Sequence, residues 1–536
     1  MYNLEKITKQ IVENKLLIGI YLFPIILLSF MFVMSSVLSN GFFFSIDDSY
    51  IYTKQAMNLL NGEFFTFSSG DVHTNSNSSV IYYLITACHL FIAKMFFNDL
   101  SDVLEALVVI SFIFNMVLYI VFVGQLHKLI LKFSFSQVNH NLILLTTVTT
   151  LPVMFSFTTG LETGFTMTLL LVQLNYFLDK KITNFTIVSV LLSVSRPENI
   201  ILNFAYILLL VYKNLKKYDF KIYISVIIIF MSLFIVPLLN YYFTGEYKTA
   251  SAARVHFNGV LKVMFAIANA LSVQYTHPNW LPTEYKYVFN TIKFLFSGVV
   301  LASLVYFIMK KYKKYNLVNI NSLIVNEKNN ENRIFILLIV ILAYSFLPLL
   351  TSISFADYGR YLSPVIPFYV LLLILAVNFN KKIVKLLIGL NLLMISFYFV
   401  SHVNATSILG KTLKPIAIKL SNISDENSTI ALDTAGYMSL FIKGNVVDVY
   451  GLGTTRYMKV HGDFDEVYEL LEKESIDYVV GWETDTPTYY LDSAHYRKAF
   501  GENNIQMIYK SDIKTITPIQ PTFPKTMAVY EVKRSN

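Results

Sequence analysis

The chain has 536 residues, of which 55% are hydrophobic and only 15% are charged, and its formal net charge is +8. The positive charge does not indicate nucleic-acid binding, because the lysines lie in short segments between apolar runs, where membrane topology accounts for them. The single cysteine, Cys88, excludes an internal disulfide and a cysteine-based zinc site. Runs of about 20 apolar residues recur between positions 16 and 400, and each is long enough to cross a membrane. Because spanning backbone must satisfy its own hydrogen bonds, we expect a polytopic α-helical membrane protein.

The first apolar run, 16–38, follows the mixed-charge segment 1–15. No small-residue cleavage site follows it, so we expect a permanent span rather than a cleaved signal peptide. Asp47 and Asp48 come just beyond this span. Carboxylates held near a bilayer are costly and usually have a function. A carboxylate there can act as a general base toward a hydroxyl or hold a metal. The alternative is that Asp47 simply caps a helix beginning at Ser49.

The acidic pair belongs to an outer loop, 40–98. Apolar residues at 52, 56, 59 and 60 have the spacing of an amphipathic helix lying on the membrane surface. Segment 80–97 is apolar enough to cross, but a crossing would turn every later lysine cluster outward. We therefore expect 80–97 to lie in or dip into the outer leaflet, where His89 and Lys94 suit an interfacial position.

Lysine clusters set the predicted topology. Those at 128–132, 180–181, 213–221, 310–314 and 381–385 are placed inside with the N-terminus, because cytoplasmic loops are rich in Lys and Arg. About eleven crossings result, and the odd number puts the C-terminus outside. The predicted spans are 16–38, 104–127, 141–158, 162–178, 182–195, 198–213, 221–241, 287–309, 333–352, 360–378 and 382–401.

Charged residues, Pro and Gly become frequent after about Ser401. We divide the chain into a transmembrane domain, 1–401, and an extracytoplasmic α/β domain, 402–536. Short strands are predicted at 429–432, 446–449, 478–480 and 527–530, and an amphipathic helix at 465–475. The turn 433–436 lacks the G-x-G-x-x-G spacing, which favours a strand-to-turn connection over a nucleotide-binding loop.

Polar motifs gather on the predicted outer face, although none of them was used to set the topology. Besides the acidic pair they are 160–163 (Gly-Leu-Glu-Thr), 195–198 (Ser-Arg-Pro-Glu), 247–256 and 357–360 (Asp-Tyr-Gly-Arg). Their convergence on one side predicts a single extracytoplasmic site.

This ordered set of motifs resembles the GT-C glycosyltransferases, multi-span enzymes that use a polyprenyl-phosphate-linked sugar as donor. It is most similar to the subgroup that contains mycobacterial arabinofuranosyltransferases. The matching segments are 47–51, 56–62, 74–77, 160–163, 195–198, 357–364, 433–436 and 447–452. Val72-His73 stands where that subgroup usually has Glu-Gly, so the sugar itself is not indicated.

The resemblance implies a GT-C-like catalytic membrane domain in the cell (inner, cytoplasmic) membrane. It implies transfer of a sugar from a polyprenyl-phosphate donor to a glycan, lipid or protein acceptor of the cell envelope, as in cell wall biogenesis. Asp47 or Asp48 would take the proton of the acceptor hydroxyl as that oxygen attacks the anomeric carbon. Two adjacent carboxylates raise the pKa of one of them, which suits a base near neutral pH.

The leaving phosphate needs cations nearby. The outer-face candidates are Arg360, Arg254, His256 and Arg196, and Arg360 ranks first because a bidentate guanidinium suits a phosphate. For two of them a structural alternative stays open: an Arg360–Asp357 salt bridge and an Arg196–Glu198 pair at a helix end.

Three acids are expected to support the site: Asp357, Glu162 and Glu198. Glu162 has the alternative of an acid that satisfies a helix N-terminal dipole. A divalent cation, Mg²⁺ or Mn²⁺, could lie between Asp357 and the acidic pair; the sequence offers no His-rich ligand set, and metal dependence stays open. The rival function is a transporter or flippase of lipid-linked sugars, which would need polar groups near the bilayer midplane and broken helices.

Overall fold

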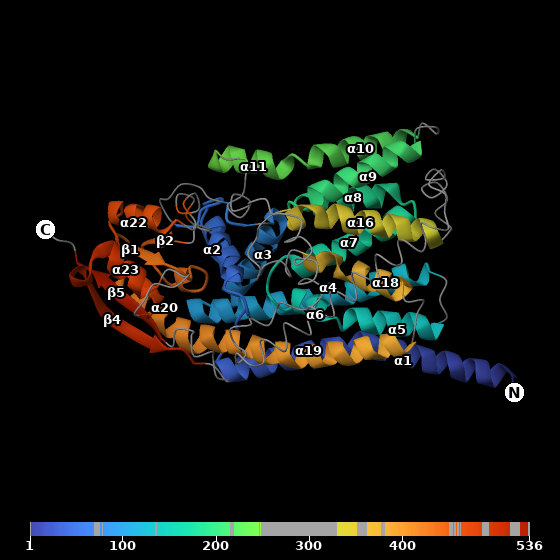
Figure 1. Ribbon diagram of the computed structural model, residues 1–536, viewed down its shortest axis with the longest axis horizontal. Helices are drawn as coiled ribbons and strands as arrows, with labels where there is room; N and C mark the ends of the chain where they lie inside the picture. Colours follow the sequence, from blue (N-terminus) through green and yellow to red (C-terminus); the bar gives the residue numbers. More distant parts are fainter. Residues whose placement is uncertain are drawn as a thin grey trace.

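The computed structural model describes residues 2–68, 75–77, 79–133, 137–214, 219–245, 330–350, 362–376, 381–449, 463–484, 492–514 and 526–533, with a few isolated residues between them. Among the described residues, those up to about 423 are mainly helical, and a sheet with flanking helices follows them (Figure 1). The described helices before the sheet are α1 (Tyr2–Ser39), α2 (Asp48–Leu60), α3 (Val80–Phe96), α4 (Leu100–Leu131), α5 (Gln137–Val148), α6 (Leu151–Ser156), α7 (Thr163–Leu178), α8 (Ile182–Ser193), α9 (Asn199–Asn214), α10 (Phe220–Ser232), α11 (Ile235–Thr244), α16 (Asn330–Leu350), η3 (Ser363–Val365), α18 (Ile366–Ala376), α19 (Lys381–Ile408) and α20 (Lys414–Ile423).

Four helical stretches in the described part of the chain are long and apolar enough to cross a membrane: Leu17–Ser39, Leu100–Leu131, Phe220–Thr244 and Val384–Ile423. Shorter apolar helices, among them α3, α7, α8 and α9, accompany them. Large apolar side chains such as Ile26, Phe91 and Ile227 point outward from these helices, as expected where the surrounding solvent is lipid. The chain is therefore a polytopic membrane protein.

The predicted span 141–158 is divided in the structure. α5 ends at Val148 and α6 starts at Leu151. Thr149 and Thr150 between them turn their hydroxyls back onto the carbonyls of Leu145 and Thr146, and Pro152 lies in the first turn of α6. Proline fits the first turn of a helix but has no N–H, so Pro152 cannot bond the Val148 carbonyl, which instead accepts the Tyr119 hydroxyl at 3.1 Å, and the apolar run breaks here. The predicted span 287–309 lies outside the described residues.

Two lysine clusters meet at one end of the bundle. Lys128 and Lys132, at the end of α4, both pair with Asp179, which precedes the predicted cluster at 180–181, and the Lys128–Asp179 distance is 2.5 Å. Arg333, at the start of α16, donates to the carbonyl of Lys132. These contacts agree with the placement of the two lysine clusters on a common side.

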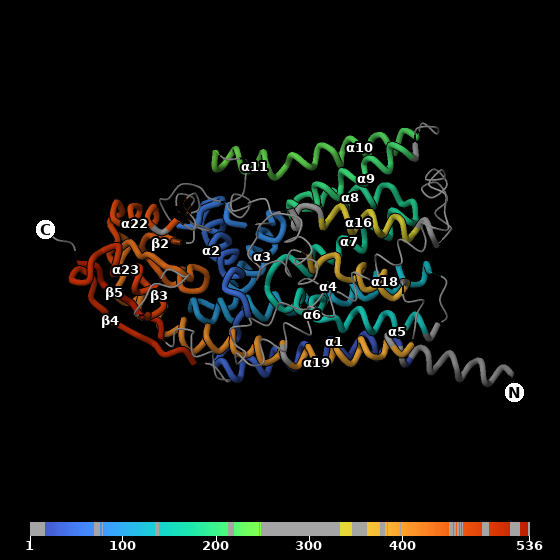
Figure 2. The backbone as a smooth tube through the Cα atoms, viewed as in Figure 1, coloured from blue at the N-terminus to red at the C-terminus, as the bar shows by residue number. Residues whose placement is uncertain are grey.

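Helix α1 lies beside α19 along the length of the bundle (Figures 1 and 2). The Ser39 hydroxyl donates to the Thr406 hydroxyl at 2.8 Å. Gly410 lies against the carbonyl of Ser39, where a Cβ would come closer than 3.0 Å, so glycine is needed at this crossing.

Helix α19 continues through position 401 and, after a π-helical turn at Leu409–Leu413, into α20. The predicted domain boundary at 401 thus falls inside a helix, and the change of architecture comes after Ile423.

The C-terminal part is a five-stranded mixed sheet of order β2-β1-β3-β5-β4. Strands β1 (Thr429–Leu432), β2 (Asn445–Asp448) and β3 (Tyr478–Trp482) are parallel, while β5 (Thr526–Val532) runs antiparallel to β3 and to β4 (Ile505–Asp512). Helices α22 (Phe464–Lys473) and α23 (Ser493–Phe500) complete this C-terminal α/β unit.

The four predicted strands correspond to β1, β2, β3 and β5, and the predicted helix corresponds to α22. Its N-terminus is fixed by Asp463, whose side chain accepts the backbone N–H of Asp465 and Glu466. Strand β4 was not predicted, because it is an edge strand with much of its surface exposed and lacks a continuous apolar run. Figure 1 shows the sheet beyond one end of the helical bundle, with the N-terminus at the opposite end and α2 between bundle and sheet.

Candidate active site

Helix α2 carries the acidic pair. Asp48 opens its first turn, and Asn61 and Gly62 end it, with Gly62 at φ +92°. Asp47 occupies the N-cap position, but its side chain makes no capping hydrogen bond. The alternative that Asp47 is a simple cap of a helix beginning at Ser49 is therefore wrong, and the carboxylate is used elsewhere.

The Asp47 carboxylate binds the turn that follows β1. Its Oδ2 accepts the backbone N–H of Gly436 and its Oδ1 accepts that of Tyr437, both at 2.8 Å. A Cβ at Gly436 would lie closer than 3.0 Å to the carbonyl and carboxylate oxygens of Asp47, so the close approach depends on glycine. The two partners are separated by 389 and 390 positions in the sequence.

Burial dominates the acid–base properties of this region. It raises the pKa of Asp47 to about 6; the two N–H donors oppose that rise, and the charges of Asp48 and Asp448 add to it. Asp433, at the end of β1, is buried, and burial together with the nearby Asp47 raises its pKa to about 8. A carboxylate that titrates near neutral pH has the proton affinity expected of a general base.

Further contacts join the first loop to the C-terminal α/β unit. The Tyr437 ring meets Tyr50 edge-on, with 4.9 Å between centroids. Lys54 of α2 donates to the Ser439 carbonyl at 2.9 Å, and burial lowers its pKa to about 8. The Ser68 hydroxyl accepts the backbone N–H of Val446 at 2.8 Å, at the start of β2. The first loop and the sheet therefore form one continuous structure around Asp47.

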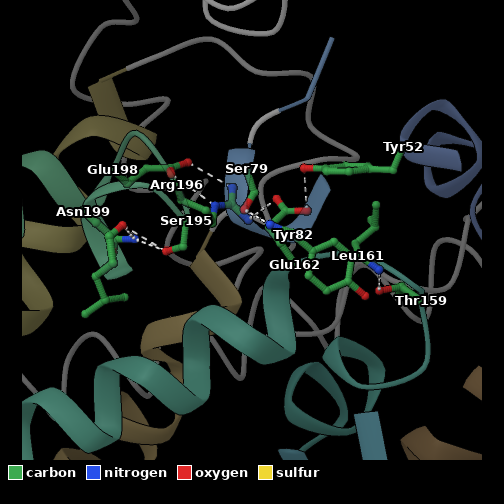
Figure 3. A network of polar contacts seen from close by, with 11 residues as sticks. Tyr52, Ser79, Tyr82, Thr159, Leu161, Glu162, Ser195, Arg196, Glu198 and Asn199 are labelled. Carbon is green, nitrogen blue, oxygen red and sulfur yellow. Dashed lines mark hydrogen bonds and ion pairs between the residues drawn. The ribbon is translucent and has the colours of Figure 1, made fainter. Parts of the chain in front are cut away.

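A buried ionic network lies one turn further along α2 (Figure 3). Tyr52, four residues after Asp48 and so on the same helix face, donates to Glu162 Oε2 at 3.1 Å. Arg196 contacts Glu162 Oε1 at 3.1 Å and holds Glu198 in a bidentate pair at 3.0 and 3.1 Å. All three charged side chains are almost completely buried. The network ties α2 to the start of α7 and to the segment between α8 and α9.

The Gly-Leu-Glu-Thr motif packs against the start of α2. Ser49 donates to the Thr159 carbonyl at 2.6 Å. Gly160 has φ +73° and faces the ring of Phe44, which a Cβ at this position would approach closer than 3.0 Å. Glycine is thus required both for the backbone conformation and for the contact.

Buried amides connect α2 to the Asn-Ser-Asn turn before α3. Gln55 donates to Ser76 at 3.1 Å and accepts a hydrogen bond from Asn77. Asn75 donates to Asn240 of α11 at 2.5 Å. Helix α2 therefore contacts the first-loop turn, Glu162 of the 160–163 motif and the C-terminal unit directly, and it is linked to the 195–198 motif through Glu162.

Of the predicted site residues, the described part of the chain contains Asp47, Asp48, Glu162, Arg196 and Glu198. The Arg196 guanidinium is enclosed by two carboxylates, which favours the helix-end pair over a role in phosphate binding. Glu162 pairs with Arg196 and Tyr52 and makes no capping hydrogen bond, so its side chain belongs to this network. Four other predicted residues lie outside the described residues: Arg254, His256, Asp357 and Arg360.

Sequence reasoning did not find Tyr52, Gly436 and Tyr437 as partners of the acidic residues. The spacing of Tyr52 from Asp48 on a predicted helix was an available signal, whereas backbone donors have no sequence signature. Within the described ranges, no group of three or more His, Cys, Asp or Glu side chains is placed to hold a metal ion.

No family model matches the chain, and neither does any curated protein. Among solved structures, the oligosaccharyltransferase of Archaeoglobus fulgidus, in complex with Zn and sulfate, is similar at a TM-score of 0.48 and 10% identity, over 90% of this chain and 79% of that one. Archaeal AglB from the same organism, in complex with an inhibitory peptide and a dolichol-phosphate, is similar at a TM-score of 0.48 and 9% identity, over 91% of this chain and 80% of that one. ArnT from Cupriavidus metallidurans, bound to undecaprenyl phosphate, is similar at a TM-score of 0.44 and 9% identity, over 96% of this chain and 99% of that one. All three TM-scores lie below 0.5.

Proposed function

We propose that the chain is a membrane glycosyltransferase that moves a sugar from a polyprenyl-phosphate donor to a hydroxyl of a cell-envelope glycan, lipid or protein. The observation that carries the proposal is the half-buried acidic pair at the start of α2, on which separate polar motifs converge. The subgroup resemblance seen in the sequence, the outward orientation of the site and the position in the cytoplasmic membrane belong to the same proposal.

Asp47 is the first choice for the general base. Its carboxylate is oriented by two hydrogen bonds, and its pKa of about 6 leaves it mostly ionised at neutral pH yet able to accept a proton. The acceptor oxygen forms a bond to the anomeric carbon, and the bond from that carbon to the phosphate oxygen breaks. The hydroxyl proton passes to Asp47, and polyprenyl phosphate leaves with the bonding electrons. Asp48 supplies the adjacent charge that helps to raise the proton affinity of Asp47.

The charge that develops on the leaving phosphate requires a cation. We assign this role to Arg360, with Arg254 and His256 as further candidates, on the sequence argument alone. Arg196 is left out, because its guanidinium already holds Glu162 and Glu198. The function of the Arg196 network is instead to fix α2, and with it Asp48, against the start of α7. Asp357 with the acidic pair remains the proposed location of a divalent cation, if one is used.

The test is an assay of the protein in liposomes with a panel of polyprenyl-phosphate sugars and envelope extracts as acceptors. The wild type should transfer sugar and release polyprenyl phosphate in equal amounts. Asp47→Asn should lower kcat by about 10²- to 10⁴-fold, the usual contribution of a general base. Asp48→Asn should retain more activity and move the acid limb of the pH profile to lower pH, because it removes a charge that raises the pKa of Asp47.

The two single variants also separate the two carboxylates. If Asp48→Asn is the inactive one and Asp47→Asn keeps a shifted profile, the roles are reversed. Wild-type activity in both variants would sink the general-base mechanism. A flippase would move the lipid-linked sugar across the bilayer intact, without release of polyprenyl phosphate, and the same samples report that outcome.

A further inference from the structure

The turn after β1 reaches out of the C-terminal α/β unit and contacts the proposed base directly. Each oxygen of Asp47 accepts one N–H, from Gly436 and from Tyr437. A carboxylate held at both oxygens can neither rotate about its Cβ–Cγ bond nor shift sideways without breaking a hydrogen bond. Its own helix does not hold it: the first N–H groups of α2 bind backbone carbonyls, with Tyr50 donating to the Asp47 carbonyl at 2.9 Å.

The turn is itself fixed in place. Ser439 donates to the Gly436 carbonyl at 2.8 Å, and the Ser439 carbonyl accepts from Lys54 at 2.9 Å. The Tyr437 ring lies against Tyr50 and Phe43, at centroid distances of 4.9 and 5.7 Å. The turn is therefore anchored through Ser439 and through the Tyr437 ring, next to the two N–H groups that bind Asp47.

The surrounding charges make these donors necessary. The carboxylates near Asp47 come from three elements: Asp48 from α2, Asp433 from the end of β1 and Asp448 from β2. Glu105 of α4 faces the neighbouring Tyr437. The charges of Asp48 and Asp448 oppose a negative charge on Asp47, and the two N–H dipoles offset them. Asp433, with a pKa of about 8, is mostly protonated at neutral pH and adds little charge.

We propose that the turn 433–437 is a positioning element of the active site, whose Gly436 and Tyr437 N–H groups hold the Asp47 carboxylate in the orientation from which it takes the acceptor proton. The C-terminal α/β unit is then part of the catalytic centre rather than a separate accessory module. This inference rests on the proposed function.

The backbone conformation of Tyr437 allows a direct test. Its φ is −62°, which the proline ring also adopts, so Tyr437→Pro deletes the N–H without imposing a different φ. Tyr437→Ala removes the same ring but keeps the N–H, and it is the matched control. A hydrogen bond to a charged group changes an equilibrium constant by about tenfold to a hundredfold. The kcat of Tyr437→Pro should therefore be lower than that of Tyr437→Ala by about the same factor. Donor KM should be the same in both.

The pH profile separates positioning from a general loss of structure. Losing an N–H donor disfavours the ionised carboxylate, so the acid limb in Tyr437→Pro should move upward by about one to two pH units relative to Tyr437→Ala. Equal kcat and equal acid limbs in the two variants would overturn the inference.

A second pair of variants covers the case in which Tyr437→Pro does not fold. Gly436→Ala forces a Cβ onto Asp47, whereas Gly389→Ala in α19 meets nothing within 4 Å and serves as the control. Gly436→Ala should show the same drop in kcat and the same upward shift, and activity equal to Gly389→Ala would contradict the proposal. If the wild type releases no polyprenyl phosphate from any donor, the proposed function fails. If the wild type is active and the pairs behave alike, only the role of the turn fails.

Discussion

Replacing Arg196 by Met tests whether the buried network is structural. The guanidinium is completely buried and contacts Glu162 and Glu198 at 3.0 to 3.1 Å. Met has a similar length but no charge, so two buried carboxylates lose their cation together. Removing one partner of a buried pair costs about 3–5 kcal/mol, and we expect a loss of unfolding free energy of at least that size.

The measurement is equilibrium unfolding in detergent micelles, with a double-mutant cycle that adds Glu198→Gln. Since Glu198 is bound at two points by Arg196, the double variant should be more stable than the sum of the single losses predicts. Lys473→Met is the exposed control: its pair with Glu469 is solvated on the surface, and its loss should cost at most about 1 kcal/mol.

One result would refute this reasoning. If Arg196→Met unfolds like the wild type but raises the donor KM strongly, the guanidinium binds the donor phosphate in the working enzyme. The Glu162–Arg196–Glu198 arrangement would then have to open during catalysis.

Three other predictions follow from particular residues. Arg360→Ala should impair donor KM and kcat much more than Arg360→Lys, because the lysine keeps a charge near the phosphate; unchanged kinetics in the alanine variant would assign Arg360 a structural role. The pKa of Asp433 is raised from its ordinary 3.8 to about 8, so its contribution to stability is complete below about pH 4 and is lost as pH rises toward 8. Between these values its contribution to the unfolding free energy falls by about 1.4 kcal/mol per pH unit. Unfolding of Asp433→Asn measured from pH 5 to 8 should lack this contribution, and a pH dependence equal to that of the wild type would contradict the assignment. If segment 80–97 does not cross, cysteines at Asn61 and Asn98 in a Cys88→Ala background should both react with an impermeant reagent from outside, whereas protection of only one would indicate a crossing.

The sequence by itself determined the class of the protein and the location of its acidic pair. Apolar runs and the spacing of apolar residues are local properties of the sequence. A helix that lies in lipid, or an element that packs against a sheet, requires them. For that reason the helices α2 and α3, four of the five strands and helix α22 could be predicted without tertiary information. The break between α5 and α6 was missed because continuous hydrophobicity outweighed the proline at 152.

Only the tertiary structure decided what the polar residues do. Arg196 suits a phosphate or a carboxylate equally well, and its role became defined when the chain brought Glu162 beside it. The hydrogen-bond partner Gly436 lies 389 positions after Asp47 in the sequence. It binds Asp47 through a backbone N–H, which any amino acid except proline provides. Hydrogen bonds between distant segments depend on where the fold places the two backbones, and a linear sequence does not record that distance.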